Sequence, residues 1–230
     1  MISLESRYQE VLDRVNAATK ASGRELTEVE LVVITKTHPA SVVAELMDLG
    51  HRVFGENKDQ EAKPKALAVA ELRPESKASW HFVGQLQSNK AKSVLSYATA
   101  IHSLDRASLL KELAKQLSAA DSQVSGFIEL NLTDDPNRGG VAPESLAMLA
   151  DKAAEVDGLS ILGVMAVAGL DVDPRVDFAR AMRASAELQK LLPTATAVSM
   201  GMSADYELAI EMGATHVRVG SAITGPRGNN

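Results

Sequence analysis

The sequence predicts a single α/β domain of the closed (β/α)8 barrel type. Three observations support this prediction: a length of 230 residues, about eight short apolar runs along the chain, and a helical pattern after almost every run. The apolar runs are nearly continuous, as in strands of a parallel sheet that is covered on both faces. A lone barrel of this type has about this length, so we treat residues 1–230 as one domain.

The chain begins with an amphipathic helix, from about Leu4 to Ala21, which the barrel pattern does not require. The first strand is expected at Leu31 to Thr35, because this run is apolar and rich in β-branched residues. It ends at Lys36, and Pro39 is well suited to start the next helix, Ala40 to Leu49. Strand, polar loop and helix therefore form the first unit, and the opening helix is an addition to the barrel.

The same unit recurs to the end of the chain. Eight units favour a closed barrel over an open sheet. An open sheet of Rossmann type should carry G-x-G-x-x-G after its first strand, where this chain has Lys36-Thr37-His38-Pro39. Further strands are expected at Arg52–Gly55, Ser79–Val83, Ala98–His102, Gln123–Leu130, Leu159–Met165, Ala197–Met200 and Thr215–Val219. Further helices are expected from near Asn57 and at Ser88–Leu95, Arg106–Ala120, Pro143–Val156, Arg175–Leu192 and Asp205–Met212.

Charge and composition exclude several classes of function. A formal net charge of -6 and a pI of about 5.4 argue against a broad surface for nucleic acid or anionic lipid. The chain has no Cys, which excludes a disulfide, a thiolate metal site and a Cys nucleophile. No apolar run is long enough to cross a membrane and no signal-peptide pattern is present, so we expect a cytoplasmic protein. A metal centre is not expected, because the histidines show no paired ligand spacing: His38, His51, His81, His102 and His216.

Two loops of small residues follow the seventh and eighth predicted strands. At this place barrels commonly bind phosphate with backbone N–H groups and the N-terminus of a helix. Gly201 and Gly220 allow a close approach of the backbone, and Ser203 lies just before the helix expected from Asp205. The Ser203 hydroxyl could donate to a phosphate oxygen, or it could simply cap its own helix. Both interpretations are open at this point.

Lys36 and Arg218 bring positive charge to the ends of the first and last strands. A lysine at a strand tip is usually solvated, but one whose stem is buried at a barrel mouth can lose its proton and attack an aldehyde. Together with a phosphate site, Lys36 suggests an aldehyde that bears a phosphate. Arg218 alternates with Val217 and Val219 and so points to the opposite face, where it would meet a pyridine nitrogen or an acidic side chain.

Groups of short motifs are spread along the chain in a characteristic order. They are Val33-Ile34-Thr35-Lys36-Thr37, Phe54-Gly55-Glu56-Asn57, Trp80-His81-Phe82-Val83-Gly84 with Leu86-Gln87-Ser88-Asn89-Lys90, and Ser199-Met200-Gly201-Met202-Ser203 with Val217-Arg218-Val219-Gly220-Ser221. Together they resemble the pyridoxal-phosphate homeostasis protein family, which is related to the barrel domain of bacterial alanine racemase. Each motif alone is weak evidence, whereas their agreement over nearly the whole chain is specific.

This resemblance implies a fold-type-III barrel that holds pyridoxal 5'-phosphate (PLP) as an internal aldimine on Lys36. It also implies a cytoplasmic monomer that acts in vitamin B6 homeostasis, without well-established turnover. By position, Arg218 would contact the pyridine nitrogen, Asn57 would lie beside the cofactor, and Met165 would line the same mouth. The residues that would bind the phosphate follow the last two strands: Ser203, Gly220 and Ser221, and Met202 through its backbone.

The chain departs from the usual family pattern at the rim of the barrel. Lys58 and Asp59 follow Asn57 where an aromatic and an apolar residue are common, and Gln85 replaces a more usual Pro or His. These differences bear on ligand or partner preference more than on cofactor binding. His81 is expected either as a satisfied core residue or as a neighbour of the cofactor.

A racemase of this fold needs a second acid–base group, which the family implies is a tyrosine from an additional β domain of a dimer partner. Tyr8 lies in the opening helix, Tyr97 before the fourth strand and Tyr206 after the seventh, so none is placed for this role. We therefore expect a carrier or buffer of PLP rather than an enzyme, with PLP-dependent apo-enzymes as candidate recipients. A low-activity PLP-dependent amino-acid racemase or aldolase is the alternative.

Two other functions stay open at this point. An aldolase that uses Lys36 directly on a phosphorylated sugar predicts a colourless protein, and a pure interaction module predicts no affinity for phosphate. The loop from Asp134 to Gly140 is a candidate gate beside the mouth. Residues 225–230 are expected to form a flexible tail.

Overall fold

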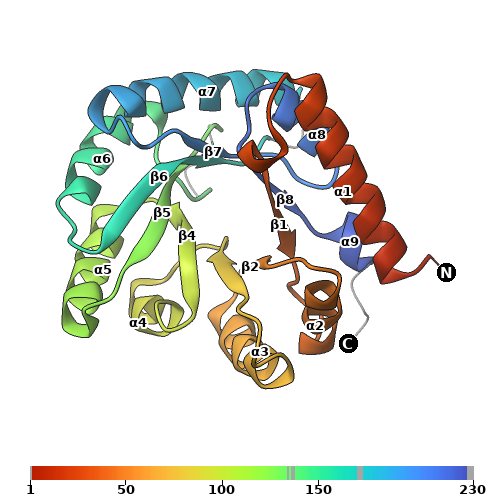
Figure 1. Cartoon of the computed structure of the whole chain (residues 1–230). Helices are drawn as coiled ribbons and strands as arrows, with labels where there is room; N and C mark the ends of the chain where they lie inside the picture. The colour runs from red at the N-terminus through yellow and green to blue at the C-terminus, as the bar shows by residue number, and fades with distance from the viewer. Residues whose placement is uncertain (1, 134, 136–137, 170–172, 227–230) are drawn as a thin grey trace.

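A closed barrel of parallel strands forms the centre of the molecule in the computed structural model, which describes residues 2–133, 135, 138–169 and 173–226 (Figure 1). The strands follow one another around the barrel in chain order, and the last strand closes it by pairing with the first, Glu30 opposite His216. The predicted barrel is therefore confirmed. The strands are β1 (Glu30–Ile34), β2 (Val53–Glu56), β3 (Ser79–Phe82), β4 (Ala98–Leu104), β5 (Val124–Leu130), β6 (Leu159–Ala166), β7 (Ala197–Ser199) and β8 (His216–Val219).

Helices cover the outside of the barrel between successive strands (Figure 1). In the described ranges, no helix combines the length and the apolar character that a membrane span requires. The helices are α1 (Leu4–Ala21), α2 (Ala40–Asp48), α3 (Asp59–Leu72), α4 (Ala91–Val94), α5 (Ala107–Ala120), α6 (Leu146–Ala154), α7 (Pro174–Leu191), α8 (Tyr206–Glu211) and α9 (Ser221–Thr224), with 3-10 turns η1 (Leu26–Glu28), η2 (Ser88–Lys90) and η3 (Pro143–Ser145).

The additional N-terminal helix, α1, has the predicted bounds and packs along α8 and α9 (Figure 1). Ser3 caps it by accepting a hydrogen bond from the N–H of Ser6. Arg7 in this helix donates to the carbonyl of Ile223 at 2.7 Å, which ties α9 to α1. The first helix of the chain thus supports the last one, which follows β8.

Three helices differ from the prediction. The helix expected at Ser88–Leu95 starts with the 3-10 turn η2 and is α-helical only over Ala91–Val94. The helix expected from Pro143 starts with the 3-10 turn η3 and is α-helical only from Leu146. The sequence does not predict α9 at all, because a single turn is too short to show a helical period. This missed helix begins at Ser221, directly after β8, and therefore at the mouth where the candidate phosphate residues lie.

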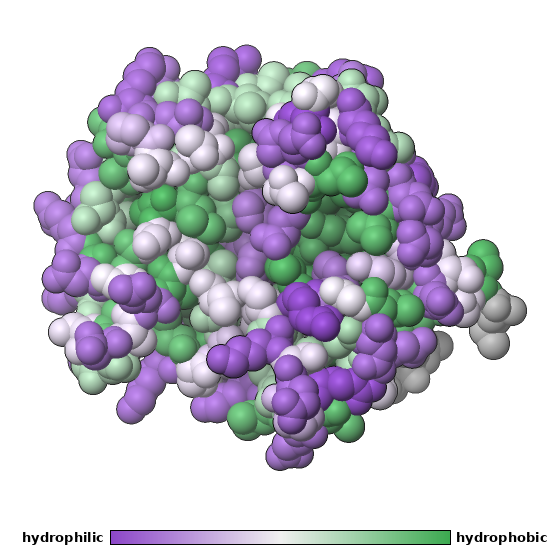
Figure 2. Space-filling view, in the orientation of Figure 1, coloured by the Kyte–Doolittle hydropathy of each residue, from purple (hydrophilic) through white to green (hydrophobic). Residues whose placement is uncertain are grey.

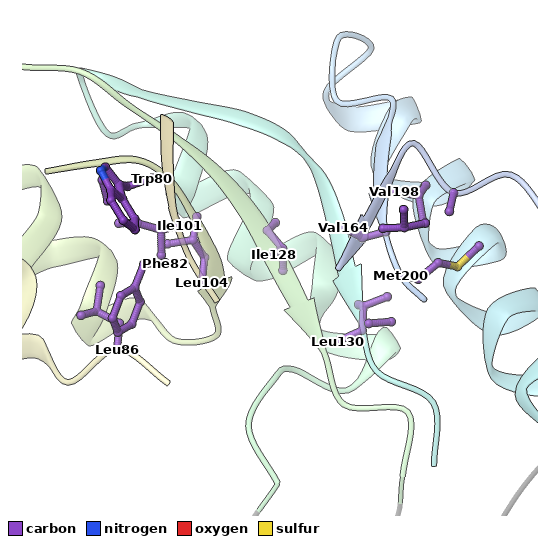
Figure 3. Packing of buried hydrophobic residues seen from close by; sticks show 14 of the residues in the cluster. Trp80, Phe82, Leu86, Ile101, Leu104, Ile128, Leu130, Val164, Val198 and Met200 are labelled. Atoms are coloured by element: carbon purple, nitrogen blue, oxygen red, sulfur yellow. The ribbon is translucent and has the colours of Figure 1, made fainter. Parts of the chain in front are cut away.

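The main core lies between the strands and the helices. Alternate strand residues point outward into it, so that Phe82 of β3 lies beside Leu86 of the following loop and Ile128 and Leu130 of β5 share one face (Figure 3). Close approach of the backbones also matters, since a Cβ on Gly163 in β6 would lie 1.7 Å from the carbonyl oxygen of Ala197 in β7. The backbones of β6 and β7 therefore approach each other closely at this point.

The interior of the barrel is more polar than this outer core. Val217 and Val219 belong to the outer core, whereas Arg218 between them is buried in the interior, as the alternation predicts. Buried interior neighbours from other strands contribute hydrogen-bonding groups and one aromatic ring: His81, His102, Ser199 and Phe127. The strands thus hold a polar network whose side chains are at most 6% exposed.

Two expectations from the sequence lie partly outside the described residues. The candidate gate from Asp134 to Gly140 includes residues 134, 136 and 137, and the expected tail includes residues 227–230. Both remain predictions.

Candidate functional site

A cavity of about 330 Å³ opens at the mouth of the barrel, where β1, β7 and β8 end. Residues far apart in the sequence share its wall, because parallel strands bring their C-terminal ends to the same edge. Ile34 contributes apolar surface to this wall, and Thr224 contributes one side of α9. The cavity is lined by six of the seven predicted site residues: Lys36, Met202, Ser203, Arg218, Gly220 and Ser221.

The end of β1 presents Lys36 to this cavity. The residues of β1 from Leu31 onward are buried and Thr35 is fully buried, while Lys36 is half-buried and Thr37 adopts a left-handed backbone with φ of 67°. Within the part of the chain that the structure describes, the Lys36 amine has no hydrogen-bond or ion-pair partner. The amine therefore lies at the cavity without a bond to any of the described side chains.

A buried lysine on α3 holds the backbone on both sides of Lys36. The amine of Lys65 donates to the Thr35 carbonyl at 2.8 Å and to the carboxylates of Glu56 at 2.6 Å and Glu61 at 2.8 Å. Glu61 in turn accepts from the N–H of Thr37. The sequence indicates only that Lys65, three residues after Ala62 and four before Val69, lies on the buried side of the helix, and not which groups it contacts.

The loops after β7 and β8 meet at the opposite wall. The Ser203 hydroxyl accepts from the N–H of Gly220 at 3.2 Å and lies 3.5 Å from the Ser221 hydroxyl. Ser203 does not cap α8, because the N-cap residue is Asp205. The alternative that Ser203 only caps its own helix is therefore wrong, and three of the four predicted phosphate residues, Ser203, Gly220 and Ser221, lie together.

Two neighbours shape this wall. Gly201 has φ of 90°, and a Cβ there would lie 2.5 Å from the Cβ of Ala209, so the turn requires glycine. The N–H of Met202 donates to the Asp205 carboxylate at 2.6 Å. Met202 thus lines the cavity, while a backbone contact from it to a ligand stays a prediction.

Arg218 forms the inner wall of the cavity. Its guanidinium donates to the Ser199 hydroxyl at 2.5 Å and to the Ala166 carbonyl at 2.9 Å. Among the described residues no acidic side chain forms an ion pair with it, so this part of the chain does not contain the acidic partner that the sequence left open. Burial lowers the pKa of Arg218 to about 10, while the negative charges of Glu129 and Asp205 act in the opposite direction and raise it. The guanidinium therefore stays protonated at neutral pH.

Asn57 and Met165 lie apart from this cavity. Asn57 lines a neighbouring hollow of about 510 Å³, together with Lys58, Asp59 and Gln85. Its backbone touches the next loop so closely that a Cβ on Gly84 would lie 2.2 Å from the Asn57 carbonyl oxygen. Met165 is buried in β6 and does not line the cavity. The position of Asn57 beside a cofactor stays a prediction.

Glu129 is a second titratable group at the mouth that the sequence analysis did not identify. It occupies the interior side of β5, the same side as Phe127, and accepts from the Gln85 amide at 2.8 Å. Burial, and then the nearby charge of Asp105, raise its pKa to about 7, against the opposing effects of Arg218, Arg138 and Gln85. Gln85, one of the departures from the family pattern, thus has a defined partner at the rim.

Comparisons with known proteins identify the family and agree with the barrel fold. Residues 11–228 match the family model described as the alanine racemase N-terminal domain. A protein of Mycobacterium tuberculosis (strain H37Rv) is 37% identical over 93% of this chain and 89% of its own length. A protein of Escherichia coli (strain K12) is 36% identical over 95% of this chain and 94% of its own length. Both are named pyridoxal phosphate homeostasis protein.

Solved structures show the same similarity. PipY of Synechococcus elongatus PCC7942, solved with PLP bound, superposes with a TM-score of 0.80 at 32% identity, over 94% of this chain and 100% of that one. Alanine racemase of Clostridium difficile 630 superposes with a TM-score of 0.71 over 95% of this chain and 60% of that one. Its 11% identity indicates a shared fold alone.

Proposed function

The chain belongs to the alanine racemase N-terminal domain family, with the pyridoxal phosphate homeostasis proteins as its relatives, and we propose that it holds PLP as a Schiff base on Lys36 and carries or buffers this cofactor. The observation that carries this proposal is the shared cavity of Lys36, Arg218, Ser203 and Ser221. An amine, a cationic donor and a group of hydroxyls around one space match the aldehyde, the ring nitrogen and the phosphate of this ligand.

The residues of the cavity fit each part of the cofactor. Lys36 would form the covalent bond, with its nitrogen replacing the aldehyde oxygen, which leaves as water. Ser203 and Ser221 would donate hydrogen bonds from their hydroxyls to the phosphate oxygens, next to the backbone of Gly220. When bound, PLP supplies an electrophilic carbon and a ring that withdraws electrons.

Arg218 supports a carrier rather than an enzyme. With a pKa of about 10 the guanidinium keeps its protons, so it would donate a hydrogen bond and leave the ring nitrogen unprotonated. An unprotonated ring is a weak electron sink, which disfavours chemistry at the α-carbon of a bound amino acid. The names of the curated relatives likewise describe homeostasis and not a reaction.

The tyrosines of the chain give no support to the racemase alternative. None of them lines the cavity: Tyr8 is buried beside His51, Tyr97 lies just before β4, and Tyr206 lies in α8.

We infer a cytoplasmic monomer that binds PLP without strong turnover, with PLP-dependent apo-enzymes as recipients. A low-activity racemase or aldolase is the second candidate, and it predicts product formation from an added amino acid.

The proposal is tested by locating the covalent bond. The purified chain is incubated with PLP, its visible spectrum is recorded, and borohydride reduction is followed by peptide mass spectrometry. We expect a pyridoxyl group on Lys36, absent from Lys36→Ala and retained in the exposed control Lys77→Ala. A protein that stays colourless and unmodified would defeat the cofactor proposal and favour an aldolase for a phosphorylated sugar.

A further inference from the structure

A chain of buried hydrogen bonds connects Arg218 with two histidines inside the barrel. The Ser199 hydroxyl, which accepts from Arg218, lies 3.0 Å from Nδ1 of His102. Nε2 of His102 lies 3.0 Å from Nδ1 of His81. These side chains come from β8, β7, β4 and β3, and none is more than 6% exposed. One network therefore crosses the interior from the cavity wall to the other side of the barrel.

The protons of this network can be assigned by counting donors and acceptors. A guanidinium only donates, so the Ser199 oxygen accepts from Arg218 and its own proton needs another acceptor. Within the described residues, the other partner of this hydroxyl is Nδ1 of His102. If Nδ1 accepts, His102 carries its proton on Nε2 and donates it to Nδ1 of His81. The reverse order would leave the buried Ser199 proton without an acceptor.

Both imidazoles are neutral, so each carries one ring proton. Burial lowers the pKa of His102 well below its usual value, and the charges of His81, Arg218 and His216 lower it further. Burial lowers the pKa of His81 to about 4, with Glu30 raising it and His216 lowering it. The ring of His102 also packs 4.3 Å from the ring of Phe127. The network thus has one arrangement in which the Ser199 proton and the His102 ring proton each have an acceptor.

We propose that Ser199, His102 and His81 are positioning residues for Arg218, forming a relay in which every donor points away from the guanidinium. Ser199 presents its oxygen to Nη1, and the Ala166 carbonyl accepts from Nη2. Two acceptors on the inner side fix the plane of the guanidinium, which leaves its other N–H groups for the cavity. This inference rests on the proposed function, since those N–H groups serve the ring nitrogen of PLP.

The direction of the relay is measured without cofactor. The whole chain is labelled with ¹⁵N-histidine, and long-range ¹H–¹⁵N spectra at pH 7 show which ring nitrogens carry a proton. We expect His102 and His81 to be protonated on Nε2, with signals assigned from the variants His102→Asn and His81→Asn. Protonation of either ring on Nδ1 would overturn the relay, whether or not PLP binds.

The effect on the cavity is measured as affinity for PLP. Ser199→Ala removes the acceptor from Arg218, and we expect the Kd to rise about tenfold, the usual effect of one buried hydrogen bond to a charged group. His102→Leu should act similarly, whereas His102→Asn keeps an acceptor for the Ser199 proton and should bind nearly as wild type. His51→Asn is the matched control, because His51 is a buried histidine outside the barrel that bonds to Tyr8 and Val53.

The outcomes separate the two proposals. Unfolding midpoints are measured first, and Ser199→Ala, the smallest change, decides the test if His102→Leu does not fold. Wild-type affinity in Ser199→Ala would mean that the network only supports the barrel, which defeats the relay. A wild-type chain that binds no PLP would defeat the proposed function instead, and the spectra without cofactor would still decide the proton order.

Discussion

Glu129 is a residue at the mouth whose ionisation depends on its surroundings. Its carboxyl ionises near pH 7 in the fold, compared with an ordinary value of 4.5, chiefly because burial disfavours the charged form. Between these two values the folded chain binds more protons at this site than the unfolded chain. The stabilisation from the protonated carboxyl is therefore full below pH 4.5 and is lost as the pH rises through 7.

Glu129→Gln is expected to remove this dependence. The difference in the free energy of unfolding between the wild type and the variant should fall by about 1–2 kcal/mol from pH 4 to pH 8. This figure is smaller than the full pKa shift implies, because the carboxyl is partly solvated and solvent screens its charge. Urea unfolding at several pH values measures this difference, with Glu71→Gln on the exposed side of α3 as control. A difference that does not change with pH would contradict the assignment.

At the scale of elements, α3 has a second task besides covering the barrel. Through Lys65 it neutralises the buried carboxylate of Glu56 and holds the backbone around Lys36. Burial raises the pKa of Glu56, and the Lys65 amine opposes that shift. Such a buried pair contributes little to stability as a whole, but loss of one partner leaves an uncompensated charge.

Lys65→Met is therefore expected to lower the free energy of unfolding by about 3 kcal/mol, because it leaves the buried Glu56 carboxylate without its partner. Met fills the space of the lysine stem, so the loss reports the charge and not a cavity. Covalent modification of Lys36 by PLP should also slow, because the loop is no longer clamped. The exposed Lys63→Met on the same helix is the control. The double variant Lys65→Met with Glu56→Gln should recover part of the stability, and a Lys65→Met chain as stable as Lys63→Met would refute the clamp.

At the scale of the whole molecule, the surface predicts a monomer. On the face shown in Figure 2, hydrophobic residues are divided into separate groups by hydrophilic and neutral ones. The large hydrophobic residues that the structure places on the surface are spread over several elements: Ile2, Leu26, Leu67, Leu72, Met148, Val176, Leu191 and Met202. Stable interfaces usually need a continuous apolar centre, which this distribution does not provide.

Sedimentation equilibrium is expected to give the mass of one chain, 24.4 kDa, with and without PLP. The net charge of -6 adds to this expectation, because like-charged chains repel at low salt. The measurement is repeated at high salt, where repulsion is screened. A mass of two chains under either condition would show that an interface exists and would reopen the question of a partner's contribution to the cavity.

The sequence by itself determined the barrel and six of the residues that line the cavity at its mouth, but it did not indicate Glu129. Apolar runs that alternate with helical patterns indicate a parallel sheet. The polar residues at the end of each run then lie at the C-terminal edge of that sheet. This local logic identified Lys36 and placed Arg218 on the interior face, and the loops that carry Ser203 and Gly220 were recognised from small residues in sequence.

The tertiary structure alone decided which residues act together. The clamp of Lys65, the bond from Gln85 to Glu129 and the network from Arg218 to His81 join residues on different strands and helices. No spacing in the sequence indicates such pairs, because their distances depend on the register and closure of the barrel. The same reason separates Asn57 from the cavity: its neighbours in space are set by the packing of two loops and not by its place in a motif.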